Sequence, residues 1–254
     1  MIFKDYFLIL SAGHIIADFY LQSTEMSQKK EQKMRWVLLH SMVYWVGMLI
    51  VMLPFLSWNM FVIASLTSAT HCLIDIWKFL YKKYHKKDNQ IKVDRNTFVV
   101  DQLLHLGCLF VISYIATVAD IRVYEAGCVR YFFNTIQVSE KQFLTWLLAF
   151  LLIYRPADIF IQKILKSYKP TSELRQSDII VKDNNTGRII GMIERTIMLV
   201  FLAIGQYSSV GLVLTAKSIA RYDKISSDKD FAEYYLLGTL LSTIIVVISS
   251  FIIV

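Results

Sequence analysis

Residues 3–22, FKDYFLILSAGHIIADFYLQ, form an apolar run that carries His14 and Asp18 in its second half. A helix of about twenty residues crosses the roughly 30 Å of hydrocarbon in a bilayer, and this run has that length. Runs of comparable length and composition recur along the chain, at residues 36–56, 60–80, 98–119, 142–162, 189–215 and 234–254. We therefore predict an all-α fold, a polytopic transmembrane helical bundle of about seven spans.

The composition agrees with a membrane protein. Of the 254 residues, 56% are hydrophobic, and the mean hydropathy of +0.48 exceeds that of a typical soluble domain. A net charge of +7 would suggest a nucleic-acid partner in a soluble protein, but basic loops on one side of a membrane explain it here. We accordingly expect membrane lipid, and no nucleic acid, as the partner of a multi-pass protein of the inner (cytoplasmic) membrane.

The connections between the predicted spans alternate in charge. Lysine and arginine are concentrated between the first and second, the third and fourth, and the fifth and sixth spans, whereas the other connections are uncharged or balanced. Because basic loops stay in the cytoplasm, this alternation predicts an N-terminus outside and a C-terminus inside. It also predicts two parts, a four-span half at 1–119 and a three-span half at 120–254 that includes a basic cytoplasmic loop at 163–188.

Histidine and aspartate recur at i, i+4 spacing in three of the first four spans. The pairs are His14 with Asp18, His71 with Asp75 and, in reversed order, Asp101 with His105, while His40 stands alone in the second span. On a helix this spacing puts both side chains of a pair on one face. The reversed pair falls in a span that runs in the opposite direction, so we expect all these groups at a similar depth, near the cytoplasmic side.

These four histidines and three aspartates are candidate metal ligands. Imidazole and carboxylate groups suit zinc, with manganese or iron as alternatives, and the set is large enough for one ion or two. A metal ion offsets the cost of burying aspartates and turns a bound water into hydroxide near neutral pH. We take Asp18, Asp75 and Asp101 as catalytic candidates, since an aspartate can ligate the metal, orient a histidine or act as general base.

Two other interpretations of the cluster stay open. Ionisable groups inside a membrane also mark ion and proton pathways, and Asp–His pairs can simply hold helices together. A pathway requires polar groups across the whole bilayer, whereas the outer halves of the second, fourth and seventh predicted spans are almost wholly apolar. This contrast favours a closed metal site over a transport pathway.

Four further polar residues are candidates for substrate binding, namely Gln22, Gln102, Arg155 and Arg195. The two glutamines lie beside the His/Asp pairs, and the two arginines lie toward the cytoplasmic side of the fifth and sixth spans. Arginine can grip a phosphate or carboxylate with two hydrogen bonds. The alternative is structural: the glutamines bond a neighbouring helix, and the arginines form ion pairs with Asp158 and Glu194.

The path of the chain over residues 205–233 is the least regular part of the predicted topology. Gly205 and Gly211 interrupt the sixth span, and a helix broken there would bring Lys217 and Arg221 back toward the other polar residues of this half.

These motifs resemble those of an uncharacterised family of bacterial membrane proteins, catalogued as domain of unknown function 3307. The resemblance rests on His14-x-x-Ala-Asp18-x-x-Leu-Gln22, His40, His71-x-x-x-Asp75, Asp101-Gln-x-x-His105, Gly187-Arg-x-Ile-Gly191-x-x-Glu194-Arg195, Ala216-Lys-Ser-x-x-Arg221 and Glu233-Tyr-x-x-x-Gly238-Thr. Because that family carries no established activity, the resemblance implies the fold and the polar cluster but no substrate. A looser similarity, limited to the first four spans, links the chain to membrane-bound metal-dependent hydrolases.

The sequence leads to the hypothesis of an integral membrane metal-dependent hydrolase. Its substrate would be an anionic amphiphile at the cytoplasmic leaflet, such as a phospholipid or an isoprenoid phosphate. The alternatives are a metal-ion or proton-coupled transporter or channel, and a non-catalytic membrane subunit whose cytoplasmic protein partner docks on the basic loops.

Overall fold

The structure is a computed structural model that describes residues 3–55, 57–85, 90–121, 126–168 and 184–253. Within these ranges the regular elements are all helices, which confirms the predicted all-α class. The chain divides into two compact units, residues 1–148 and residues 149–254, and each is described by itself.

The helices of the first unit begin with α1, which continues into a π-helical turn, η1. The elements are α1 (Phe3–Ile15), η1 (Ile16–Tyr20), α2 (Thr24–Lys30), α3 (Met34–Met52), η2 (Leu53–Phe55), α4 (Trp58–Tyr84), α5 (Gln90–Val118), α6 (Gly127–Ile136) and the first part of α7 (Glu140–Ile153). The second unit contains the end of α7 and α8 (Arg155–Leu165), η3 (Lys166–Tyr168), α10 (Asn184–Ala203), α11 (Tyr207–Ile219), α12 (Tyr222–Ser227) and α13 (Lys229–Ile253).

Five helical segments are, by length and composition, long and apolar enough to cross a membrane, as expected of a membrane protein. They are Met34–Phe55, Trp58–Tyr84, Ile91–Val118, Glu140–Tyr168 and Lys229–Ile253. Each coincides with one of the predicted spans. The first and sixth predicted spans are not among the five, so the predicted count of about seven stays a prediction.

Local sequence signals fix where several helices begin and end. The Ser23 and Ser57 hydroxyls cap α2 and α4, each accepting a hydrogen bond from the backbone N–H three residues later. Pro156 lies in the first turn of α8 and has no N–H to continue the helix that precedes it. The chain therefore bends at Tyr154, and α7 and α8 are separate helices within one apolar segment.

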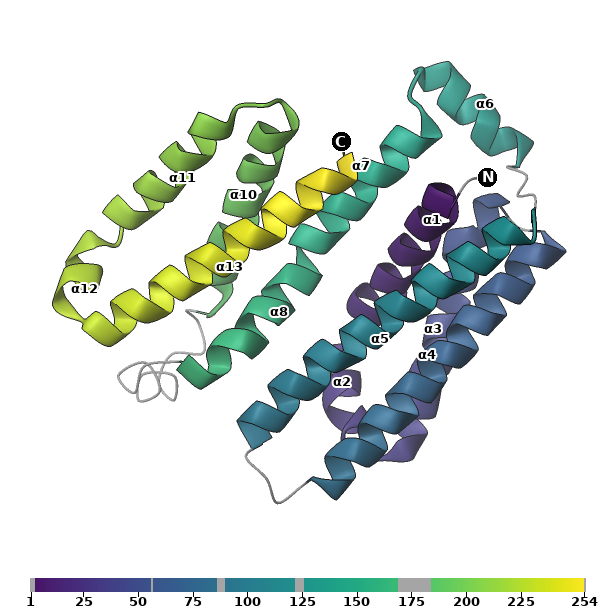
Figure 1. The fold of residues 1–254 in the computed structure, drawn as a ribbon, viewed down its shortest axis with the longest axis horizontal. Helices are drawn as coiled ribbons and strands as arrows, with labels where there is room; N and C mark the ends of the chain where they lie inside the picture. The colour runs from purple at the N-terminus through teal and green to yellow at the C-terminus, as the bar shows by residue number, and fades with distance from the viewer. Residues whose placement is uncertain (1–2, 56, 86–89, 122–125, 169–183, 254) are drawn as a thin grey trace. The chain divides into compact units, whose positions relative to one another are not determined.

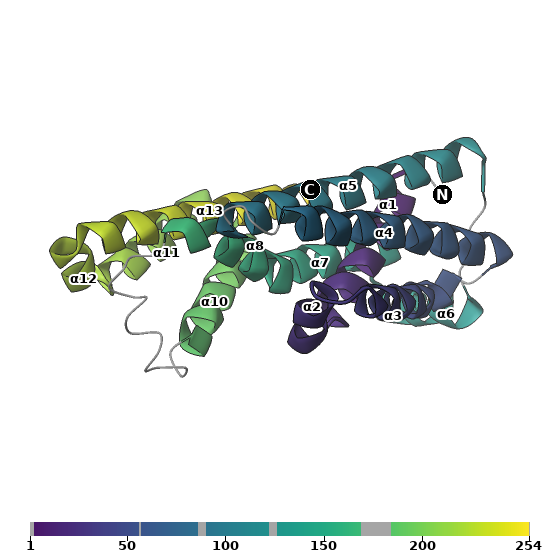
Figure 2. The ribbon, with the colours of Figure 1, turned by 90° about the horizontal axis from the view of Figure 1, so that it is seen from below.

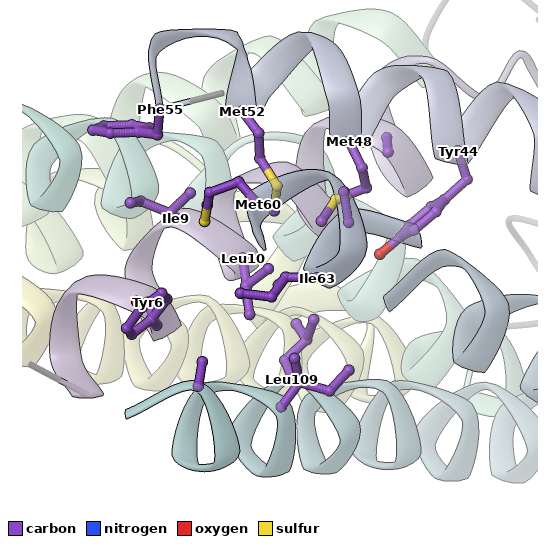
Figure 3. Close-up of a cluster of buried hydrophobic side chains, with 14 residues drawn as sticks. Tyr6, Ile9, Leu10, Tyr44, Met48, Met52, Phe55, Met60, Ile63 and Leu109 are labelled. Atoms are coloured by element: carbon purple, nitrogen blue, oxygen red, sulfur yellow. The ribbon is translucent and has the colours of Figure 1, made fainter. Parts of the chain in front are cut away.

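The core of the first unit lies where α1, α3, α4 and α5 pack against one another (Figure 1). Figure 3 shows this core, in which Tyr6, Met48, Met60 and Leu109 come from the four helices in turn. The short helix α2 packs beside α3, as Figure 2 shows. The first predicted span is therefore part of a four-helix packing arrangement even though α1 itself has only 13 residues.

Two glycines allow α1 and α3 to approach closely. A Cβ atom at Gly13 would lie 2.7 Å from the Met48 sulfur, and one at Gly47 would lie 2.6 Å from a Leu21 methyl and 3.2 Å from the Ala17 Cβ. Small residues serve this purpose in membrane helices, because packing contacts drive their association.

Substitution of Gly47 by valine is expected to destabilise the first unit by about 1–3 kcal/mol, the usual cost of overpacking a filled interface. The measurement is the midpoint of denaturant-induced unfolding in detergent micelles, followed by loss of helical signal. Gly107→Val is the matched control, since a Cβ at this position on α5 meets no atom within 4 Å. Equal midpoints for the two variants would contradict the close α1–α3 approach.

The predicted span at 189–215 consists of two helices, and the break lies at one of the two glycines that were expected to interrupt it. α10 ends at Ala203, and α11 starts at Tyr207 after a turn in which Gly205 has φ of +73°. Only glycine adopts this conformation at low cost, so the break follows from the sequence. Gly211, by contrast, lies inside α11 and interrupts nothing.

Helix also occupies both ends of the predicted loop at 163–188. Residues 163–168 complete α8 and η3, and residues 184–188 form the first turns of α10. The rest of the predicted loop, 169–183, lies outside the described residues.

Candidate metal centre

The first unit brings all four histidines and three aspartates of the predicted cluster together. They form three overlapping groups whose ligand atoms lie within 4.8 Å of one another: His14, His71 and His105; Asp18, His40 and His71; and Asp75, Asp101 and His105. The helices α1, α3, α4 and α5, with the π-turn η1, supply them. Six of these residues are buried, and the Asp18 side chain is 10% exposed.

In the first group, the His71 and His105 rings are stacked with an angle of 18° between their planes, and the His14 ring is tilted to both, by 56° and 40°. The ring centroids of His71 and His105 are 4.4 Å apart, and that of His14 lies 5.8 Å from the first and 5.1 Å from the second. Tyr44 orients two of these rings: its hydroxyl lies 3.1 Å from His14 Nδ1, and its ring stacks on His71 at 3.8 Å. The imidazoles are therefore held in place before any ligand binds.

Asp18 connects the second group. Its Oδ1 atom lies 3.0 Å from His40 Nε2 and 3.6 Å from His71 Nε2. The aspartate belongs to the π-turn, in which the Leu21 N–H donates to the Ile16 carbonyl five residues earlier. Such turns are often found at functional sites because they change the direction of one side chain within a helix.

Two lysines complete the cluster, and the sequence analysis did not include them. Lys30 Nζ lies 3.0 Å from Asp75 Oδ2, and Lys78 Nζ lies 2.7 Å from Asp101 Oδ2. The sequence did contain a signal for Lys78, which lies inside an apolar span one helical turn after Asp75. Lys30 gave no such signal, because it belongs to a basic connection where lysine is expected.

The site also contains buried polar atoms without a hydrogen-bond partner among the described residues. They are His40 Nδ1, both ring nitrogens of His71, His105 Nε2 and Asp101 Oδ1. Since a buried unpaired polar group costs about 1–3 kcal/mol, so many in one place point to a bound ligand that supplies the missing contacts.

The two glutamines lie at the edge of the cluster, next to the lysine–aspartate pairs. Gln22 Oε1 accepts a hydrogen bond from Lys30 Nζ at 3.4 Å, and Gln102 Nε2 donates to Asp101 Oδ2 at 3.2 Å. Their predicted contact with substrate stays a prediction. In this structure they support the charged residues.

The polar residues of the second unit form a different arrangement. Arg195 is buried and donates from Nε to the Ile153 carbonyl at 2.6 Å, at the bend between α7 and α8. Glu194 pairs with Lys217 at 2.5 Å, and Asp158 pairs with Arg188 at 2.9 Å. As predicted, the break at Gly205 brings Lys217 back to the polar residues of this unit, where it pairs with Glu194. The ion pairs predicted for Glu194 and Asp158 were with Arg155 and Arg195.

These contacts bear on the two predicted roles of the arginines. Arg155 is partly exposed, and Arg195 holds the backbone of α7 while its Nη2 atom lacks a partner. Asp158 and Glu194 therefore take part in ion pairs, with Arg188 and Lys217 among their partners. Binding of a head group by Arg155 and Arg195 stays a prediction.

Comparison with known proteins bears on the first unit alone. Residues 6–129 match a family described as "Protein of unknown function (DUF3307)", and this stretch includes every histidine and aspartate of the cluster. No curated protein and no solved structure matches the chain.

Proposed function

Residues 6–129 make this chain a member of the DUF3307 family, and from the geometry of its site we propose that the protein is a membrane-embedded, metal-dependent hydrolase of an anionic amphiphile. The observation that carries the proposal is the buried cluster of imidazoles with unpartnered nitrogen atoms beside Asp18. Neutral imidazole is the commonest metal ligand in proteins, and it needs no charge compensation in an apolar environment.

The donor set fits one divalent ion, with zinc as the preferred metal. Asp18, His40 and His71 would hold it, and His14 and His105 adjoin them. When bound, such an ion lowers the pKa of a coordinated water to near neutrality. Asp75 and Asp101 would be less available as ligands, because a lysine ammonium contacts each of them.

The remaining groups have roles that follow from their contacts. Asp101 Oδ1 is buried, receives no hydrogen bond from the described residues and lies 3.5 Å from His105 Nε2, and we assign it as the oxygen that accepts a proton as general base. Tyr44 fixes the orientation of His14 and His71 through its hydroxyl and its ring. The buried core on one side of the cluster keeps bulk water away from it.

The orientation of the first unit follows from the basic connections. Lys29, Lys30, Lys33 and Arg35 precede α3, and six further lysines and arginines lie between residues 82 and 95. With these segments in the cytoplasm, the N-terminus is outside and the cluster opens toward the inner leaflet of the cytoplasmic membrane. A phospholipid or an isoprenoid phosphate would present its head group at this depth.

The purified protein is expected to contain about one zinc ion per chain, as a site with histidine and carboxylate ligands would. Elemental analysis checks the metal. Release of head group or phosphate from phosphatidic acid, phosphatidylglycerol and an isoprenoid diphosphate checks the reaction, before and after chelation and after zinc is restored. Absence of metal together with absence of hydrolysis would contradict the proposal.

A proton or metal-ion pathway is the second candidate, and one specific contact chain favours it. Lys30, Asp75, His40 and Asp18 follow one another at 3.0 Å, 3.6 Å and 3.0 Å. Such buried chains can pass protons. Proton or zinc flux into proteoliposomes that is lost in His71→Ala, without any hydrolysis, would favour transport over the first proposal.

A further inference from the structure

Lys30 and Lys78 enter the cluster from two different helices, α2 and α4. Lys30 is 8% exposed, and the Lys78 side chain is 17% exposed. Burying an ammonium group inside a membrane is costly, so such residues are usually functional. Neighbouring lysines differ in their partners. Lys29, on α2, pairs with exposed Glu25. Lys82, on α4, is itself 13% exposed but pairs with Glu31 and Asp94, which are 46% and 28% exposed, whereas Asp75 and Asp101 are nearly fully buried.

The charge of the cluster changes sign when a metal ion binds. Three aspartates and two lysines, with neutral histidines, carry one negative charge in total. A divalent ion reverses this to one positive charge in a buried environment, where an unbalanced charge is costly. The loaded site therefore requires an anion of about one charge to become neutral, and a phosphate diester carries that charge.

Both ammonium groups keep N–H groups for such an anion. An ammonium has three N–H donors. Lys30 uses them toward Asp75 and Gln22, and Lys78 toward Asp101. At least one N–H on the first and two on the second have no acceptor among these contacts.

We infer that Lys30 and Lys78 bind the phosphate group of the substrate, which makes the substrate class a phosphate ester. This inference rests on the proposed metal-dependent function. The two aspartates hold the ammonium groups beside the metal ligands, so that phosphate, once bound, lies between the lysines and the imidazoles. Lysine is well suited to this role as a compact charge with three rotatable donors.

Methionine at either position is expected to weaken binding of inorganic phosphate about tenfold or more, the effect of losing one charge-assisted hydrogen bond. The measurement is calorimetric titration of the purified, zinc-loaded protein, with zinc content determined in parallel. Lys29→Met and Lys82→Met are the matched controls, one on each helix, and both should bind phosphate like the wild type. Zinc content should not change in any of the four.

A second measurement uses the wild-type protein and so does not depend on the folding of a variant. Acylation of lysines is followed by mass spectrometry with and without phosphate, and with vesicles of phosphatidylcholine alone or containing phosphatidylglycerol. Protection of Lys30 and Lys78 by free phosphate supports the inference, and further protection by phosphatidylglycerol alone identifies a lipid diester as the source. Protection that is equal at Lys29 and Lys82, or unchanged phosphate affinity in both methionine variants, would overturn it.

The outcomes also separate this inference from the proposed function. Missing zinc in the wild type, with none taken up when zinc is added, would contradict the metal-dependent function and with it the charge argument on which the lysine inference rests. Full zinc content with unchanged phosphate affinity in the methionine variants would contradict the lysine inference alone.

Discussion

Asp18→Asn is expected to remove bound metal from the purified protein, and this is the largest effect of any single substitution in the cluster. Among the described residues, the ion pairs of Asp18 are both with imidazoles, at 3.0 Å from His40 and 3.6 Å from His71. Asparagine keeps its shape but removes the negative charge that a divalent ion requires. Metal content per chain, measured by elemental analysis, should fall to background.

Asp75→Asn provides the comparison that makes the result specific. Lys30 contacts Asp75, so this carboxylate supports the site without being free to ligate. We expect zinc affinity to fall about 10- to 100-fold, as it does when a group that orients metal ligands is lost. Equal metal loss in both variants, or wild-type metal content in Asp18→Asn with its helical content intact, would contradict the assignment of Asp18.

A reporter fused after residue 254 is expected on the outer side of the membrane, opposite to the C-terminus predicted from the sequence. The reason is that α10 and α11 form a hairpin. Leu199 on α10 packs in one cluster with Val210, and Glu194 pairs with Lys217 near the other end of α11. The two helices are therefore antiparallel, and the chain returns toward the side from which α10 started.

The direction of α13 follows from its own contacts. The Tyr235 hydroxyl donates to the Lys217 carbonyl at the level of Glu194, while Val246 packs in the same cluster as Leu199. α13 thus runs parallel to α10, and in Figure 1 it lies beside α8 and α10. If α10 leaves the cytoplasm, α13 leaves it too.

Charge supports the same direction. Lys217, Arg221, Lys224 and Lys229 surround the connection between α11 and α13, whereas the turn at 204–206 carries no charge. Because basic loops prefer the cytoplasm, we expect the first connection inside and the turn outside. The charges of residues 216–233 are balanced in sum, but acidic residues have little influence on orientation, so the basic residues decide.

Alkaline phosphatase fusions measure this topology, because the enzyme is active only when exported. Fusions after Gly205 and after residue 254 should be active, and a fusion after Leu165 should be inactive. Activity of the fusion after Gly205 with no activity of the fusion after residue 254 would show that α11 does not cross back to the cytoplasm. That result would agree with the cytoplasmic C-terminus predicted from the sequence.

Much of the fold was predictable because a membrane imposes simple rules on sequence. Five of the predicted spans coincide with apolar helical segments, since length and hydropathy decide which segments can cross. The convergence of His14, His71 and Asp101 was also predictable. Their i, i+4 spacing to a partner puts each pair on one face of its helix, and the direction of each helix puts the pairs at a similar depth in the membrane. In the sixth span the sequence indicated a break at Gly205 or Gly211 but not which of the two glycines makes it; the turn is at Gly205, and Gly211 lies inside α11.

The candidate site was predictable only in part. Lys30 could not be recognised, because its position depends on how α2 folds back toward α4, and the sequence shows only another loop lysine. For a similar reason, the sequence did not show that Arg188 pairs with Asp158 or that Lys217 pairs with Glu194. The periodicity of a helix shows on which side of that helix a residue lies. It does not show which residue of a neighbouring helix the side chain contacts.

The sequence by itself determined a helical membrane protein with histidine and aspartate on shared helix faces, because hydropathy and helical period are properties of each segment alone. Only the tertiary structure showed that Asp18 contacts imidazoles, whereas Asp75 pairs with Lys30 and Asp101 pairs with Lys78. It also showed that α11 packs antiparallel to α10. These features depend on the rotation and packing of one helix against another, which arise only when the segments meet.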